Sequence, residues 1–164
     1  MPSNKIDYHI RYLRPNEYHL IKDFTYQALF VKQGQFIPAD ILDQPEIKNY
    51  YHNFGLKDDM ALAAVINEEV IGIVWTRIIK GEIKGYGYWD DRSPEFGISL
   101  LAKYRRYGIG TKLMKEMLKL LKENGYSFAS LSVQKDNPAV KLYQKLGFKI
   151  EQRRKEECLM SIKL

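Results

Sequence analysis

Two apolar runs separated by only three polar residues constrain the fold of this 164-residue chain most strongly. The runs read MALAAVI, residues 60–66, and VIGIVWTRII, residues 70–79, and the three residues between them read NEE. Apolar runs of this length that are rich in β-branched residues predict strands, and a short polar connection between two strands predicts a hairpin. An antiparallel hairpin is therefore expected over residues 60–79.

Alternation and helical spacing predict the elements around this hairpin. Further strands are expected at 8–14, in a third region that runs through YGYWDD (86–91) and resumes at EFGISLL (95–101), at 127–133 and at 158–164. Helices are expected to begin at Pro15 and to span 45–54, 109–123 and 138–146. The predicted order is β-α-α-β-β-β-α-β-α-β-β, in which the strand that directly follows the helix 138–146 has no assigned range, and this is a mixed α+β fold in one domain over residues 1–164.

Composition argues against several classes of protein. No apolar run approaches the roughly 20 residues of a membrane-spanning helix, and the N-terminus lacks the apolar stretch of a signal peptide, so we expect a cytoplasmic protein without a membrane partner. The single cysteine excludes an intrachain disulfide, and the three histidines show no metal-ligand spacing. The net charge of +6 is spread along the chain, which does not favour a nucleic acid partner.

The stretch YRRYGIGTKLM, residues 104–114, is the strongest candidate for a binding site. A Gly-x-Gly turn that leads into a helix can point several backbone N–H groups at one anion, and the helix N-terminus adds partial positive charge. Arg105 and Arg106 add guanidinium groups that suit phosphate oxygens. The stretch is read either as a phosphate site or as a glycine-rich, basic helix start.

Spacing excludes two common phosphate loops. A P-loop requires Gly-x-x-x-x-Gly-Lys-Ser/Thr, whereas Thr111 here precedes Lys112 and no earlier glycine fits. A dinucleotide fingerprint requires a third glycine three residues after the second, and that position is occupied by Leu113. Neither loop explains the stretch.

The spacing of Arg105, Gly108 and Gly110 matches the Arg-x-x-Gly-x-Gly signature of the GNAT superfamily of N-acyltransferases. A second block, NPAVKLYQKLGF at residues 137–148, is similar to a later helix of that family, and the chain resembles the family over nearly its whole length. The resemblance implies an N-acetyltransferase that uses acetyl-coenzyme A as its cosubstrate. The alternative is an acyl-coenzyme A sensor without turnover.

The resemblance also assigns roles to particular residues. The backbone of Ile98, Ser99 and Leu100 is expected to pair with the pantetheine arm like an added strand. The pyrophosphate is expected at the loop, whose residues are Arg105, Arg106, Tyr107, Gly108, Ile109, Gly110 and Thr111. Asn137 corresponds to an asparagine before the later helix, where it either contacts the cofactor or serves as a plain N-cap.

Two residues are candidates for the chemistry. Tyr143 matches the tyrosine that protonates the leaving thiolate, and its alternative role is that of a packed aromatic on a helix face. Glu95 stands where many members of the family carry a carboxylate base, and its alternative role is that of a surface glutamate at a strand edge. On the next strand, Ser132 occupies the position where other members of the family have a base. Because serine cannot act as a base, Glu95 is favoured for that role.

The acceptor is expected to be a primary amine on a small molecule or a peptide. The loop resembles those of protein N-terminal acetyltransferases, but a loop that binds the cofactor does not choose the acceptor. The aromatic residues and carboxylates within residues 86–91 suit a cationic amine, and they equally suit an exposed hairpin. A homodimer is compatible with the sequence. Cys158 lacks the partners that would make it an acyl carrier, so direct transfer in a ternary complex is expected.

Overall fold

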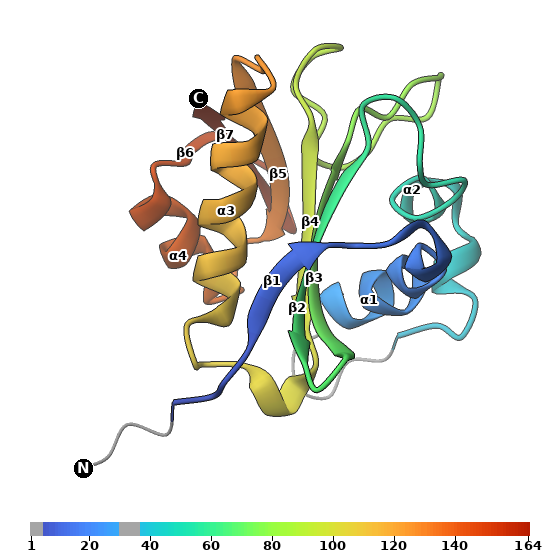
Figure 1. The fold of residues 1–164 in the computed structure, drawn as a ribbon. Coiled ribbons are helices and arrows are strands. Elements are labelled where there is room, and N and C mark those ends of the chain that lie inside the picture. The colour runs from blue at the N-terminus through green and yellow to red at the C-terminus, as the bar shows by residue number, and fades with distance from the viewer. Residues whose placement is uncertain (1–4, 30–36) are drawn as a thin grey trace.

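A computed structural model describes residues 5–29 and 37–164. Seven strands form one sheet in the order β1-β2-β3-β4-β5-β7-β6 (Figure 1). The strands are β1 (His9–Tyr12), β2 (Met60–Ile66), β3 (Glu69–Arg77), β4 (Glu95–Leu100), β5 (Phe128–Gln134), β6 (Lys149–Arg153) and β7 (Glu157–Lys163). Every neighbouring pair is antiparallel except β4 and β5. The α+β class and the predicted order of strands and helices are confirmed.

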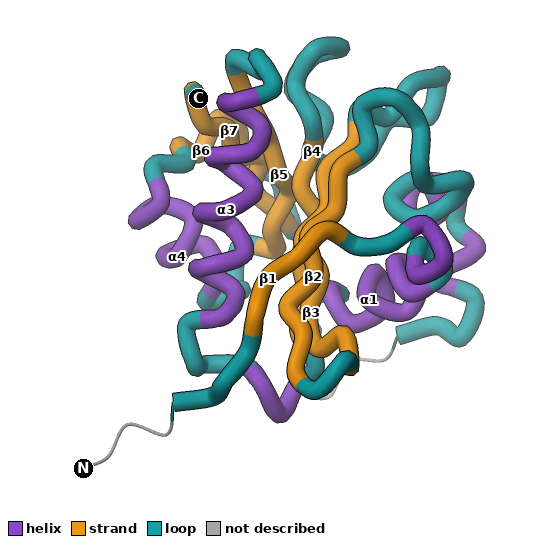
Figure 2. The backbone as a smooth tube through the Cα atoms, viewed as in Figure 1, coloured by secondary structure: helices purple, strands orange, loops and turns teal. Residues whose placement is uncertain are grey.

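Helices cover both faces of the sheet, with α3 and α4 on one side and α1 and α2 on the other (Figures 1 and 2). They are α1 (Leu20–Ala28), α2 (Pro45–Lys48), α3 (Ile109–Glu123) and α4 (Ala139–Leu146). Short 3-10 turns lie at Pro15–Glu17, Ile41–Asp43 and Ala102–Tyr104. Because β2 and β3 are covered on both faces, they are apolar at nearly every position rather than at alternate ones.

The core consists of two layers separated by the sheet. Leu62 and Val74 pack with the α3 residues Leu113 and Met117 on one side. Ala63, Ile73 and Trp75 pack with Ile21 and Phe24 of α1 on the other side. The side-chain alternation of each strand thus supplies both layers from the same apolar run.

Three boundaries differ from the prediction by more than two residues. Pro15 begins a 3-10 turn, and α1 starts only at Leu20. The helix expected over 45–54 ends at Lys48 and continues as turns. The stretch 86–91 forms a loop, and β4 begins at Glu95, because the backbone there turns to place Gly85 and Gly87 against the Glu95 carboxylate.

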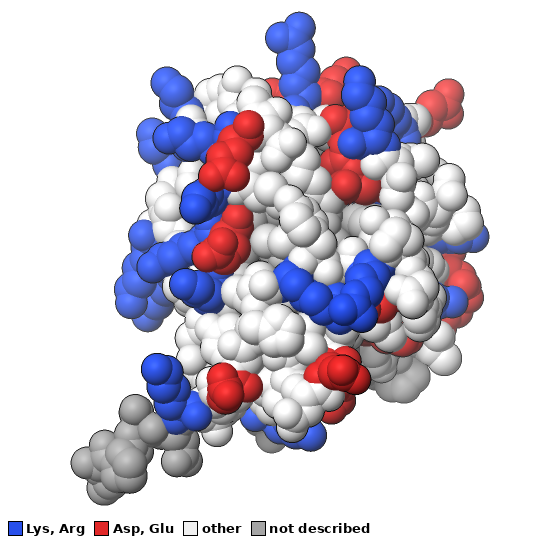
Figure 3. Space-filling view, viewed as in Figure 1, with Lys and Arg blue, Asp and Glu red and all other residues white. Residues whose placement is uncertain are grey.

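The surface around α3 carries both signs of charge (Figure 3). Lys112 lies 3.8 Å from Glu116, and Lys119 lies 4.0 Å from Glu123, each pair one helical turn apart. Exposed pairs of this kind contribute only a few tenths of a kcal/mol each, roughly 0.3–0.5. They do, however, intersperse the basic charge of this helix with acidic charge.

Candidate active site

The sheet opens between β4 and β5. The two strands run parallel, and the only register pair between them in the described structure joins Glu95 to Ser130. Beyond that pair lies a cavity of about 890 Å³. Six of the residues proposed from the sequence line it, namely Ile98, Ser99, Leu100, Arg105, Asn137 and Tyr143. The opening brings together side chains that are as far apart in the sequence as Thr25 and Glu157.

One edge of β4 faces this cavity. On its other edge the strand pairs with β3, with Ile98 opposite Val74 and Leu100 opposite Gly72. The hydroxyl of Ser99 is occupied, because it donates a hydrogen bond to the carbonyl of Phe24 at 2.5 Å. Strand edges without a partner recruit extended ligands through their backbone groups, so residues 98–100 are suited to hold an extended arm.

The glycine loop has the backbone geometry of an anion site. Arg106 and Gly108 have positive φ angles of 70° and 82°, which turn the chain sharply into α3. The N–H groups of residues 106–111 have no backbone acceptor within the described structure. Because they lie at a helix N-terminus, they provide both donors and partial positive charge for a phosphate group.

Space at the loop is consistent with a bound pyrophosphate. A Cβ atom added at Gly108 would meet nothing within 4 Å, and one at Gly110 would meet only Leu100 at 3.5 Å. The backbone is therefore open to a ligand rather than covered by side chains. Tyr107 is exposed, whereas the side chain of Ile109 is fully buried, so Ile109 can offer a ligand only its backbone.

Arg105 is engaged with the protein itself. Its Nε donates to the carbonyl of Leu100 at 3.1 Å, and its Nη2 donates to the carbonyl of Gln27 at 3.3 Å. The side chain thereby ties the loop to the end of β4 and to the C-terminal end of α1. Arg106, which is exposed and makes no side-chain hydrogen bond in the described structure, is the freer of the two arginines.

Tyr143 and Asn137 lie at the α4 side of the cavity. Tyr143 is buried and makes an edge contact with Phe148, with the ring centroids 5.9 Å apart. Burial raises the pKa of its hydroxyl to about 12, so the group stays protonated at neutral pH. Asn137 accepts a hydrogen bond from the N–H of Ala139 at 2.9 Å, which is a capping contact, and it also lines the cavity.

Glu95 is a buried carboxylate and not a surface residue at a strand edge. Only 4% of it is exposed. Its Oε2 accepts hydrogen bonds from the Tyr50 hydroxyl at 2.6 Å and from the N–H of Gly87 at 3.2 Å. Burial raises its pKa to about 7, although these two hydrogen bonds and the charge of Arg154 lower it. A carboxyl group with such a pKa can take up and release a proton near neutrality.

Several of the proposed residues do not line the cavity. Residues 106–111 and Glu95 are not among its lining residues, although Glu95 is hydrogen-bonded to Tyr50, which is. Tyr50 itself was not singled out from the sequence, because the segment that carries it contacts β4 only through the tertiary fold. The sequence does contain one signal for this segment. Arg77 is a charge inside the apolar run 70–79, and a buried charge requires a partner from elsewhere in the chain. That partner includes the segment of Tyr50, because Arg77 donates to the carbonyls of Asn49 and His52.

The rest of the described structure adds two findings. No described helix has the length and apolarity that crossing a membrane would require. Residues 5–29 and 37–164 contain no group of three or more His, Cys, Asp or Glu side chains placed to hold a metal ion.

The geometry is suited to hold an extended ligand between two strands and an anionic group at a helix N-terminus. Residues 23–148 match the Acetyltransferase (GNAT) family, and the chain belongs to that family. It is an acetyl-transferring enzyme, and the family to which it belongs uses acetyl-coenzyme A as the acetyl donor, as the sequence predicted.

Two relatives are called N-alpha-acetyltransferase. The protein of Sulfurisphaera tokodaii is 35% identical over 70% of this chain and 73% of its own length. The protein of Saccharolobus solfataricus is 33% identical over 78% of this chain and 81% of its own length.

Among solved structures, the PaiA N-acetyltransferase of Thermoplasma acidophilum in complex with coenzyme A is similar, with a TM-score of 0.68. It is 20% identical, over 97% of this chain and all of that one. At this identity the likeness concerns the fold.

Proposed function

We propose that this enzyme transfers the acetyl group directly from acetyl-coenzyme A to a primary amine within a ternary complex, and that the amine is the N-terminal α-amine of a peptide. The names of the two relatives support the peptide acceptor. The observation that carries the proposal is the cavity between β4 and β5, which is lined by Tyr143 and by Tyr50, the hydrogen-bond partner of Glu95.

When bound, acetyl-coenzyme A supplies a thioester whose C–S bond breaks as the amide C–N bond forms. Tyr143 is the acid of the reaction: its O–H donates a proton to the leaving sulfur. The high pKa of Tyr143 keeps its hydroxyl protonated at neutral pH, so that the group can donate a hydrogen bond and a proton to the sulfur as negative charge develops there.

Glu95 is the base of the reaction. The attacking nitrogen carries a proton that must leave, and the Glu95 carboxylate takes it up. With a pKa of about 7, a substantial fraction of the carboxyl groups is ionised at neutral pH, and the protonated form is equally accessible afterwards. The matching position on β5, Ser132, lines the cavity but is not basic enough to replace it.

Direct transfer is favoured over an acylated enzyme. Cys158 is the only cysteine, and its side chain is buried in β7. It is not among the residues that line the cavity. A thiol in that position cannot accept an acyl group and pass it to an amine.

Carboxylates near the cavity suit a cationic acceptor. Tyr86 and Glu157 line the cavity, and the charges of Glu46 and Glu157 act on the Tyr86 hydroxyl. Arg154 lies 3.4 Å from Glu157 and offsets part of this charge, and the carboxylates that remain attract an ammonium group. The apolar side chains of Ile37, Ile41 and Ile47 line the cavity as well, which suits an acceptor with an apolar side chain beside its amine.

The proposal is tested by thiol release with matched acceptors. We expect turnover of acetyl-coenzyme A with a short peptide that has a free N-terminus and an apolar first residue. The control is the same peptide with its N-terminus formylated and with a lysine residue whose side-chain amine is free. This control peptide should be inactive. Turnover of the formylated peptide, without turnover of the peptide that has a free N-terminus, would contradict the choice of the α-amine. Binding of acetyl-coenzyme A without turnover on any amine would favour the sensor, which the comparisons do not support.

A further inference from the structure

Tyr50 connects the cavity to the Glu95 carboxylate through a hydrogen bond. The tyrosine lines the cavity, whereas Glu95 does not. The hydroxyl of Tyr50 donates to Glu95 Oε2 at 2.6 Å. On another side, a Cβ atom built at Gly85 would stand 2.4 Å from Oε1 and 2.5 Å from Oε2, so the loop backbone packs directly on the carboxylate. Of the groups that hydrogen-bond Glu95 in the described structure, Tyr50 alone lines the cavity.

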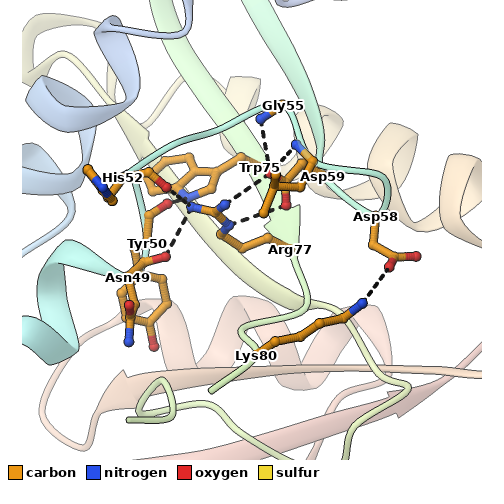
Figure 4. Close-up of polar contacts among 10 residues, drawn as sticks. Asn49, Tyr50, His52, Gly55, Asp58, Asp59, Trp75, Arg77 and Lys80 are labelled. Atoms are coloured by element: carbon orange, nitrogen blue, oxygen red, sulfur yellow. Dashed lines mark hydrogen bonds and ion pairs between the residues drawn. The ribbon is translucent and has the colours of Figure 1, made fainter. Parts of the chain in front are cut away.

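The segment that carries Tyr50 is fixed by two buried donors of β3 (Figure 4). The indole Nε1 of Trp75 donates to the Tyr50 carbonyl at 3.0 Å. Nη1 of Arg77 donates to the carbonyls of Asn49 at 3.1 Å and His52 at 2.8 Å. Three carbonyls on and around Tyr50 are thus held from one strand, which fixes the backbone from which the Tyr50 side chain extends to Glu95.

Arg77 is in turn held by Asp59, as Figure 4 shows. Its Nε and Nη2 donate to the two carboxylate oxygens at 3.2 and 3.0 Å, and the two side chains are only 6% and 2% exposed. A buried ion pair gives little net stability compared with apolar residues of the same volume, but its directional bonds define one geometry. In this chain, that geometry is the position of Tyr50.

We propose, on the basis of the function proposed above, that Tyr50 is a further catalytic residue that carries the proton from the acceptor amine to Glu95. The N–H bond of the amine breaks and an O–H bond forms on the Tyr50 oxygen, while the original O–H bond of Tyr50 breaks and its proton goes to Glu95 Oε2. The tyrosine is neutral before and after the step. Glu95 gains one proton, and the nitrogen loses one.

Three groups set the ionisation of Glu95: the Tyr50 hydroxyl, the Gly87 N–H and the charge of Arg154, all of which lower its pKa against the effect of burial. Burial and the charge of Glu95 raise the pKa of Tyr50 well above its ordinary value, so Tyr50 relays a proton rather than acting as a standing anion. Removal of the hydroxyl should therefore move the acidic limb of the pH–rate profile to higher pH.

Tyr50→Phe tests this role, with Tyr51→Phe as the matched control. Tyr51 is the neighbouring tyrosine, and its hydroxyl donates to the backbone carbonyl of Leu42 at 2.6 Å, away from Glu95. We expect Tyr50→Phe to lower kcat by roughly tenfold or more and to move the acidic limb upward, while Tyr51→Phe changes neither. Adding Tyr50→Phe to Glu95→Gln should cause little further loss, because the two residues act as one unit.

A kcat of Tyr50→Phe equal to that of Tyr51→Phe would overturn the relay. The carboxyl of Glu95, followed by ¹³C NMR, gives a second readout that does not depend on turnover. We expect it to titrate at higher pH in Tyr50→Phe than in the wild type, and an unchanged titration would overturn the pairing. A wild-type protein that turns over no amine would refute the proposed function, and the titration would still decide on the Tyr50–Glu95 pair.

Discussion

Replacing Glu95 by glutamine should stabilise the protein at alkaline pH but not at acidic pH. In the unfolded chain the carboxyl has its ordinary pKa of 4.5, whereas burial raises the pKa to about 7 in the folded protein. Between these values the folded state holds a proton that the unfolded state has lost, so the free energy of unfolding falls as pH rises. A pKa raised from 4.5 to about 7 corresponds, at about 1.4 kcal/mol per pH unit, to about 3 kcal/mol in all.

Glutamine keeps the shape of the side chain and can still accept the hydrogen bonds from Tyr50 and Gly87, but it carries no charge at any pH. We therefore expect the variant to gain about 3 kcal/mol relative to the wild type between pH 4.5 and pH 8. Urea unfolding of both proteins at several pH values measures this difference. Glu82→Gln, at an exposed position, is the control. A difference between the Glu95 variant and the wild type that does not change with pH would refute the reasoning.

Three further predictions concern the other proposed residues. Tyr143→Phe should lower turnover by roughly ten- to a thousandfold with little change in coenzyme A affinity, as measured by steady-state kinetics and calorimetry. Gly110→Glu should abolish coenzyme A binding in calorimetry, while Gly110→Ala, whose methyl group meets only Leu100 at 3.5 Å, should keep the fold; Gly108→Glu should also abolish binding, with added strain from its positive φ. Arg106→Ala should weaken coenzyme A binding and reduce its salt dependence, which calorimetry at two ionic strengths measures.

The parts of the fold that could be predicted are those in which local pattern and tertiary structure agree. The hairpin 60–77 and helix α3 have apolar residues at the spacing that their packing uses, and α3 spans 109–123 as expected. The loop around Gly108 could also be predicted, because a few neighbouring residues encode both its conformation and the start of the helix that follows it.

The parts that could not be predicted depend on contacts between distant segments. Residues 49–53 form turns rather than a continued helix, since their carbonyls accept hydrogen bonds from Trp75 and Arg77 instead of from helical N–H groups. The loop 86–91 likewise turns so that Gly87 can donate to Glu95 and accept a hydrogen bond from Ser130. No local propensity encodes either arrangement, so Tyr50 could not be placed beside Glu95 from the sequence.

The same contacts explain how the protein can retain a buried carboxylate that weakens the fold above neutral pH. Without the Tyr50 and Gly87 hydrogen bonds the pKa of Glu95 would rise further, and the group would be protonated when a base is needed. Those bonds persist only if the 49–59 segment keeps its position, and Arg77 and Asp59 fix that position through directional bonds that apolar residues could not make. If Glu95 is the base, as proposed above, the buried ion pair supports activity by fixing the backbone that presents the Tyr50 hydroxyl to Glu95, rather than by adding stability.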